Sequence, residues 1–189
     1  MKKKCSIKQK VKKVNAKKGR STKQKSTCIP GELTELAYHY TTGELFVEIC
    51  ETNILDPFKT VTFSGEKPIL WFSLHPHFEQ TATKCTFSDE TQTIRRLSMD
   101  ETKLFGDGLV RFAYPAKNLI RWPEIGKQAG MTKKTIKQLE NIGIMQQANP
   151  LNWMGSFEPI HLSQMMDLQI MRVDSNEWIS INDMEEDAA

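Results

Sequence analysis

The chain has 189 residues, of which 39% are hydrophobic, and a net charge of +3, so it is long enough to bury the core of one domain. No apolar run approaches the roughly 18 residues that a membrane span needs, and none follows the basic N-terminal residues as in a secretory signal. These features exclude a membrane protein and favour a cytoplasmic one.

The charge is distributed unevenly along the chain. Residues 1–31 contain 12 of the 26 Lys and Arg and no Asp or Glu, which leaves 14 basic against 23 acidic residues in the remainder. Such a segment has little aliphatic surface to bury and repels itself, so we predict a disordered basic arm over 1–31, one domain over 32–183 and an acidic tail over 184–189.

Nucleic acid is a natural partner for the arm, because Lys and Arg displace counterions from a phosphate backbone. The alternatives are a solubilising tail or one that covers the acidic body of the same protein. The basic residues expected to make the nucleic-acid contact are Lys12, Lys13, Lys17, Lys18 and Arg20.

Neither the cysteines nor the histidines form a recognised metal pattern. The four cysteines are widely spaced, with no C-x-x-C pair, which argues against a zinc ribbon or a disulfide scaffold. Two further groups contain ligand types, but their spacings match no established zinc signature, so we predict no metal site. They are His75-Pro76-His77-x-Glu79 with Cys85 nearby, and Glu158-x-x-His161.

The first predicted elements are a strand at 36–40 and a helix at 43–52. The strand is rich in aromatic and β-branched residues. Thr41 with Glu44 three residues later makes a capping-box signal, apolar residues then recur at helical spacing, and Asn53 can cap the C-terminus.

The middle of the chain predicts two further strands joined by a long loop. After a turn-rich segment at 58–68, a strand is expected at 69–73. Residues 74–107 have weak periodicity, which suggests a loop over a site with a short helix near 94–97. A turn at 106–108 then leads to a strand at 109–114.

The last third predicts two helices and three strands. Pro123 lies early in the first helix, Thr132 caps the second, and an apolar stripe ends before Gly143. A loop at 149–156 precedes strands at 157–162, 168–173 and 178–181. Short strands outnumber the helices, and the helices are not regularly interposed between the strands. The predicted fold class is therefore α+β, with a mixed sheet and flanking short helices.

Several of these segments resemble the ADP-ribosyltransferase superfamily in its His-Tyr-Glu group, which includes diphtheria-toxin-like, poly-ADP-ribose-polymerase-like and DNA-targeting toxin members. The resemblance covers roughly residues 35–181 and is closest to a group of bacterial proteins of that superfamily. It implies a largely antiparallel split sheet, NAD as substrate and a macromolecule as acceptor. The segments that carry it are Tyr38-His39-Tyr40-Thr41, Trp71-Phe72-Ser73, Gln80-Thr81-Ala82, Val110-Arg111-Phe112, Asn149-Pro150-x-x-Trp153 and Glu158-Pro159-Ile160.

The resemblance also implies roles for individual residues. Glu158 is the expected catalytic carboxylate, which stabilises the ribose cation as nicotinamide leaves. His39 is expected to hold the adenosine-side ribose, and backbone groups near Tyr40 and Thr41 to receive the nicotinamide amide. The group usually offers a tyrosine to stack on nicotinamide, whereas this chain has Trp71 and Phe72, followed by the Ser73 hydroxyl.

A guanidinium is expected to bind the pyrophosphate, because its geometry matches phosphate oxygens. Arg111 is the first candidate, followed by Arg95 and Arg96.

Each of these residues also has a purely structural interpretation. A strand histidine such as His39 is commonly a hydrogen-bonded core residue, and Trp71 and Phe72 are typical of a core strand. Glu158 could occupy a solvated turn, and Arg111 the solvated face of its strand.

The alternative function is a non-enzymatic DNA- or RNA-binding protein. Residues 124–143 have spacings compatible with a helix-turn-helix whose second helix carries Lys133, Lys134 and Lys137, although the same pattern fits any amphipathic helix. For the enzyme, the basic arm favours a nucleic-acid acceptor slightly over a protein acceptor. A toxin role would imply an antitoxin or immunity protein as partner.

Overall fold

The computed structural model describes residues 35–57, 65–89, 92–172 and 174–184. The predicted basic arm with its five candidate contacts, most of the 58–68 loop and most of the acidic tail lie outside them. Among the described residues, no helix has the length and apolar character needed to cross a membrane. The α-helices of the described residues are α2 (Gly43–Thr52), α3 (Met99–Phe105), α4 (Glu124–Gln128) and α5 (Lys133–Met145).

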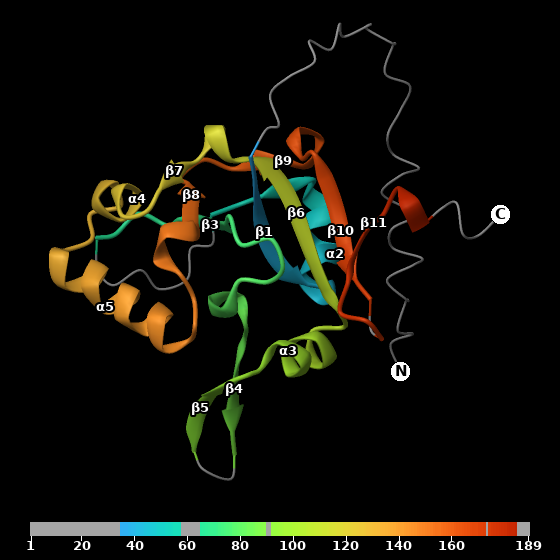
Figure 1. The fold of residues 1–189 in the computed structure, drawn as a ribbon, viewed down its shortest axis with the longest axis horizontal. Coiled ribbons are helices and arrows are strands. Elements are labelled where there is room, and N and C mark those ends of the chain that lie inside the picture. Colours follow the sequence, from blue (N-terminus) through green and yellow to red (C-terminus); the bar gives the residue numbers. More distant parts are fainter. Residues whose placement is uncertain (1–34, 58–64, 90–91, 173, 185–189) are drawn as a thin grey trace, which may run out of the picture.

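Seven strands form one antiparallel sheet in the order β11-β10-β6-β1-β3-β8-β7 (Figure 1). Two smaller pairs, β2 with β9 and β4 with β5, complete the α+β fold. The strands are β1 (Leu36–Thr42), β2 (Ile54–Leu55), β3 (Leu70–Ser73), β4 (Cys85–Ser88), β5 (Thr93–Arg96), β6 (Leu109–Pro115), β7 (Ile120–Arg121), β8 (Trp153–Ser156), β9 (Ile160–His161), β10 (Asp167–Met171) and β11 (Trp178–Ser180).

The centre of the sheet is the pairing of β1 with β6. These strands align along their whole length, from Leu36 opposite Pro115 to Thr42 opposite Leu109. On its other side, β1 aligns with β3 only at Tyr38 and Ser73. The two strands therefore splay apart immediately beside His39, the predicted site histidine.

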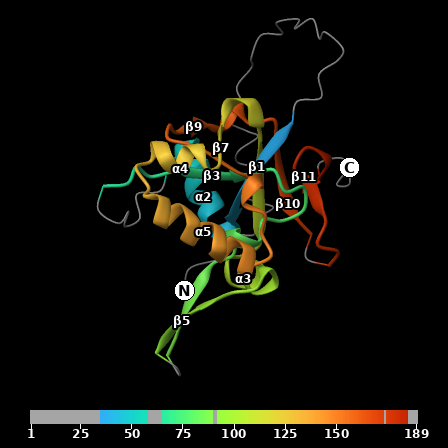
Figure 2. The same cartoon turned by 60° about the vertical axis from the view of Figure 1, so that its left-hand side comes forward.

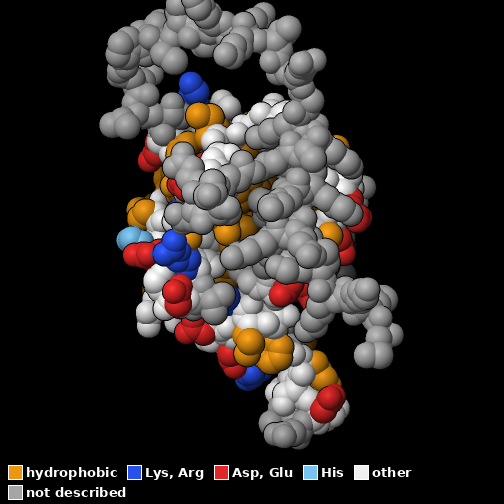
Figure 3. Space-filling model, turned by 90° about the vertical axis from the view of Figure 1, so that its right-hand side faces the viewer, with side chains coloured by type: hydrophobic (Ala, Val, Ile, Leu, Met, Phe, Trp, Pro, Cys, Tyr) orange, Lys and Arg blue, Asp and Glu red, His pale blue; other side chains and the backbone are white. Residues whose placement is uncertain are grey.

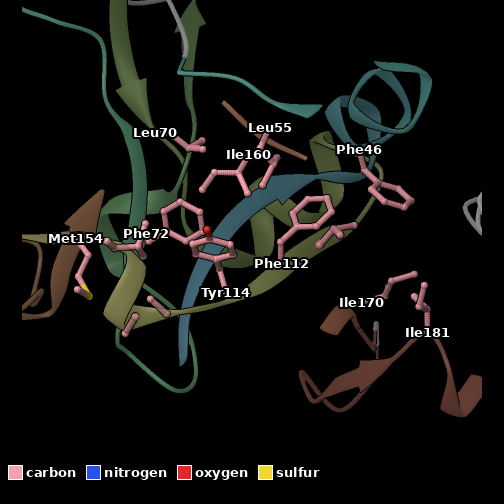
Figure 4. Packing of buried hydrophobic residues seen from close by; sticks show 14 residues of the cluster. Phe46, Leu55, Leu70, Phe72, Phe112, Tyr114, Met154, Ile160, Ile170 and Ile181 are labelled. Carbon is pink, nitrogen blue, oxygen red and sulfur yellow. The ribbon is translucent and has the colours of Figure 1, made fainter. Parts of the chain in front are cut away.

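One face of the sheet packs against α2 through the main hydrophobic core. Phe46 of α2 is fully buried and its ring lies 6.0 Å from that of Phe112 in β6. Phe72 and Tyr114 continue the cluster across the sheet, with their ring centres 5.8 Å apart (Figure 4). Burial of these large side chains is the main favourable term that holds α2 on the sheet.

Helix α2 has the predicted bounds, but its predicted capping box is wrong. The N-cap is Thr42, whose side chain makes no capping hydrogen bond. The Gly43 and Glu44 N–H groups instead donate to the carbonyl oxygens of Gly108 and Gly106, at 3.0 and 3.1 Å. A turn far along the chain thus satisfies the first amides of the helix. The predicted C-cap is confirmed, since Asn53 adopts a left-handed φ of 58°.

The segment 74–107 contains more structure than predicted, and the short helix expected near 94–97 is wrong. That stretch contains β5, which pairs with β4 in a hairpin that projects from the sheet (Figures 1 and 2). Helix α3 follows and was not predicted, although its signal is present. Ser98 and Glu101 form a complete capping box.

The predicted loop at 149–156 is also wrong in part, because residues 153–156 form β8 in the main sheet. The strand expected at 157–162 is reduced to the two residues of β9. The last two predicted strands correspond to β10 and β11.

Helices α4 and α5 pack at the β7–β8 end of the sheet around a second cluster (Figure 1). Both predicted helices are confirmed, and the Thr132 side chain accepts from the Thr135 N–H as an N-cap. A Cβ atom on Gly143 would lie 2.4 Å from Cζ2 of Trp153. The missing side chain at Gly143 therefore lets α5 rest directly on the indole of β8.

We predict that Gly143→Ala destabilises the protein by about 1–3 kcal/mol, because the Trp153 ring must move to admit the methyl group. Helix propensity alone predicts a gain of up to about 1 kcal/mol. Urea denaturation distinguishes the two, with Asn141→Ala, at an exposed position of the same helix, as control. A stabilised Gly143→Ala protein would show that the packing argument fails.

Candidate functional site

A pocket of about 440 Å³ lies where β1 and β3 splay apart. Its walls come from these two strands, from the segment that contains Glu79 and Lys84, from α5 and from Trp153, with Asp56 and Arg96 as further charged residues of the lining. The volume is in the range of small-molecule sites. Of the predicted site residues, the pocket brings together His39, Tyr40, Trp71, Phe72 and Ser73.

His39 occupies the split between the strands. Its Nδ1 lies 2.9 Å from the carbonyl oxygen of Trp71, and because a carbonyl only accepts, Nδ1 carries the proton. Burial, together with the positive charge of Lys84, lowers the pKa of His39 to about 4, although the bond to Trp71 opposes this shift. The ring is therefore neutral at pH 7, and Nε2 is left as a hydrogen-bond acceptor.

A buried carboxylate, Glu79, is held beside Ser73. Oε2 of Glu79 accepts from the Ser73 hydroxyl at 2.7 Å, and Oε1 accepts from the Thr81 hydroxyl at 2.8 Å and the Thr81 N–H at 3.2 Å. Glu79 is only 5% exposed. All three donors are uncharged groups, so the carboxylate is fixed in place without a cationic partner among them.

Trp71 and Phe72, the two candidates for stacking, have different environments. Phe72 is 3% exposed and packs into the main core against the rings of His39 and Tyr114. Trp71 is 38% exposed and meets Trp122 and Trp153, with ring centres 5.9 and 6.5 Å away. Of the two, Trp71 has the surface free to stack on a planar ligand.

Tyr40 and Thr41 belong mainly to the framework. The Tyr40 hydroxyl donates to the His75 carbonyl oxygen at 2.8 Å, its ring meets Phe78 edge to face, and burial raises the pKa of its hydroxyl. Thr41 is buried and does not line the pocket.

Arg111, which was predicted to bind pyrophosphate, does not line this pocket, and it is not on a solvated face either. It is 6% exposed, and its guanidinium lies between the rings of Tyr38 and Trp178, at 4.1 and 4.5 Å from their centres. It donates to the carbonyl oxygens of Pro76 and His77 and to Oε1 of Gln169, at 2.6, 3.3 and 2.5 Å. These contacts anchor the 74–79 segment to the sheet.

The other two arginines differ from each other. Arg95 is bound to Glu101 at 2.8 Å on the surface. Arg96 lines the pocket, and its Nη1 donates to the Gln80 carbonyl oxygen and the Thr83 hydroxyl at 3.3 and 2.8 Å.

Glu158, the predicted catalytic carboxylate, is exposed and does not line the pocket. Strand β8 runs antiparallel to β3, with Trp153 opposite Ser73 and Ser156 opposite Leu70. The chain has therefore passed the far end of β3 when it reaches Glu158, whose N–H donates to the Ser156 hydroxyl at 3.0 Å. The structure gives Glu158 the solvated-turn position.

The groups considered for metal binding are used in local contacts. Nδ1 of His75 accepts from the N–H groups of His77 and Phe78, and Nδ1 of His161 contacts the Ser163 hydroxyl. Among the described residues, no three His, Cys, Asp or Glu side chains are grouped so that they could hold a metal ion.

In the segment predicted as a helix-turn-helix, α5 forms a wall of the pocket through Leu139, Ile142 and Gly143. Lys133, Lys134 and Lys137 lie on its exposed side.

Figure 3 views the molecule from the β11 side and shows acidic and basic side chains next to one another on the described part of that face.

Comparison of the chain with protein-family models, with curated proteins and with solved structures gives no match. The interpretation of the site therefore depends on its own geometry.

We predict that stability falls as the pH is lowered from 6.5 toward 4, in part because of His39. Its pKa is near 6.5 when unfolded and about 4 when folded, so in this interval the unfolded chain binds a proton that the folded chain does not. The contribution reaches at most about 3 kcal/mol. The free energy of unfolding of His39→Asn, measured by urea denaturation across this interval, should fall less steeply than that of the wild type; equal slopes contradict the assignment.

We predict that Arg111→Lys lowers the free energy of unfolding by about 1–3 kcal/mol. A lysine ammonium cannot reproduce both the stacking of the guanidinium between two rings and its several hydrogen bonds. Arg121→Lys is the matched control, since Arg121 forms only an exposed ion pair with Glu35 and should change stability by less than about 0.5 kcal/mol. Thermal or urea unfolding of both variants checks this, and equal losses would remove the special role of Arg111.

Proposed function

We propose that the protein is an NAD-dependent ADP-ribosyltransferase that binds NAD in the pocket between β1, β3 and α5. The observation that carries this proposal is the presence, in one pocket, of a neutral histidine, a half-exposed tryptophan and a carboxylate held by a serine. They are His39, Trp71, and Glu79 with Ser73. The sequence resemblance leads us to expect His39, Trp71 and Ser73 in such a pocket, whereas the carboxylate that it implies, Glu158, does not line it.

In this proposal the carboxylate is Glu79 and not Glu158. Loss of nicotinamide leaves positive charge on the ribose, and a fixed negative group near that carbon stabilises the transition state more than the neutral ground state. The two oxygens of Glu79 accept three hydrogen bonds, whereas a carboxylate has about four acceptor positions. Glu79 can therefore accept one further bond, from a ribose hydroxyl.

The remaining groups position the substrate. Trp71 offers a ring face for nicotinamide, and Nε2 of His39 accepts from a ribose hydroxyl without adding a positive charge beside the developing cation. Nucleic acid remains the favoured acceptor because of the basic N-terminal residues, and an antitoxin remains a predicted partner.

A second candidate, nucleic-acid binding without catalysis, is favoured by the exposed Lys133, Lys134 and Lys137 of α5. Phosphate contacts by these lysines would make binding salt-dependent and independent of the arm. Salt-dependent DNA binding that survives deletion of residues 1–31, without release of nicotinamide, would support this alternative over the enzyme.

The test is incubation of the purified protein with labelled NAD and a mixture of DNA, RNA and cell protein. Wild type should release nicotinamide and label one acceptor class. Glu79→Gln should lower the rate by about 100-fold or more, as removal of a transition-state contact does. Glu158→Gln is the matched control and should remain close to wild type.

Two outcomes overturn the proposal. One is no nicotinamide release by folded wild-type protein with any acceptor. The other is loss of activity in Glu158→Gln with Glu79→Gln unaffected, which would restore the assignment from sequence. Because Glu79 is buried, its substitution could also unfold the protein. Thermal unfolding of each variant, and of Ser73→Ala, which removes one hydrogen-bond donor to Glu79, shows whether a loss of activity comes from chemistry or from folding.

A further inference from the structure

Two cations enter the pocket from the base of the β4–β5 hairpin. Lys84 immediately precedes β4, and Arg96 ends β5 opposite Cys85. The backbone of Lys84 is held on both sides, because its N–H donates to the Thr102 hydroxyl at 3.2 Å and its carbonyl oxygen accepts from the Leu97 N–H at 2.8 Å. The hairpin thus fixes the backbone positions of Lys84 and Arg96.

Neither cation forms an ion pair with a carboxylate of the described chain. Arg96 is held only by a carbonyl oxygen and a hydroxyl, through Nη1. Its Nε and Nη2 donate to no described residue and remain available to a ligand. Arg95, its neighbour on the strand, contrasts with it, because Glu101 neutralises Arg95.

Lys84 is partly buried without a partner of opposite charge among the described residues. Burial lowers the pKa of its ammonium group, as expected where desolvation is uncompensated. Glu79 forms no ion pair with Lys84, and the hydrogen bonds that hold Glu79 come from the hydroxyl and amide donors of Ser73 and Thr81. Lys84 and Arg96 therefore bring to the pocket positive charge that no ion pair among the described residues neutralises.

We propose that Lys84 and Arg96 form an anion subsite that binds a phosphate or pyrophosphate group of the ligand. This inference rests on the proposed function and deepens it, because it assigns the phosphate-binding residues of the same pocket. Guanidinium and ammonium groups are cationic side-chain groups that proteins commonly use to bind phosphate oxygens. The ring of the ligand then extends from the hairpin base toward Trp71.

The subsite predicts a selectivity that can be measured without catalysis. Isothermal titration with adenosine, AMP, ADP and inorganic pyrophosphate should give tighter binding as phosphates are added, with ADP at least about tenfold tighter than adenosine. The ADP affinity should fall as salt is raised, because the interaction is between charges. Adenosine affinity should change little.

The variants are Lys84→Met, Lys84→Arg and Arg96→Met, with Arg95→Met as matched control. Lys84→Met and Arg96→Met should each weaken ADP by about tenfold or more and leave adenosine unchanged. Lys84→Arg should retain most of the ADP affinity, and Arg95→Met should bind all ligands like the wild type. If Lys84→Met unfolds, shown by its thermal transition, Arg96→Met and Lys84→Arg still provide the test.

The outcomes separate this inference from the proposed function. ADP binding that needs Lys84 and Arg96, with no nicotinamide release from NAD, supports the subsite and overturns the transferase. Nicotinamide release with ADP affinity unchanged in Lys84→Met and Arg96→Met supports the transferase and overturns the subsite. ADP that binds no more tightly than adenosine to the wild type also overturns it.

Discussion

The site depends on one hydrogen bond, from Nδ1 of His39 to the carbonyl oxygen of Trp71. Strands β1 and β3 align only at Tyr38 and Ser73, so the Trp71 carbonyl has no partner from β1 in the ladder. A strand carbonyl that lacks a donor in the ladder needs another hydrogen-bond partner. The histidine ring supplies the donor and occupies the gap that the splay creates. The same contact fixes the tautomer of His39 and leaves Nε2 free as an acceptor. The splay of β1 from β3 therefore accounts both for the opening in the sheet and for the tautomer of His39.

A second constraint holds the segment that crosses the sheet after β3. Arg111 lies between two aromatic rings and donates to the carbonyl oxygens of Pro76 and His77. The Tyr40 hydroxyl and the Trp178 indole N–H donate to the same stretch, at His75 and His77. With its carbonyl groups bonded to the framework, this segment delivers Glu79 to Ser73 in one position. Arg111 does not line the pocket itself and therefore acts on it through this segment.

The sequence predicted the elements whose signals are local. The strand with His39, helix α2 with Asn53, and the Thr132 cap of α5 follow from aromatic and β-branched composition, helical spacing and terminal residues. Strand β8 was missed because its four residues, from Trp153 to Ser156, alternate weakly and include a glycine. Glu79 was considered only as a metal ligand, since its partner Ser73 lies in a strand and their pairing requires a turn that no motif announces. Glu158 was chosen from its place in the chain order, but the direction of β8 carries it past the pocket.

The charges in the pocket are arranged so that opposite groups do not neutralise each other. An ion pair between Glu79 and Lys84 would neutralise both charges. Instead, hydroxyl and amide groups hold the carboxylate, while backbone contacts hold the base of the hairpin. Neutral donors fix a charge in space and leave its field largely intact, which is the arrangement that electrostatic preorganisation requires. A ligand that is negative at one end and develops positive charge at the other would complement both Lys84 and Glu79. No ion pair between these two residues would have to break before the ligand binds.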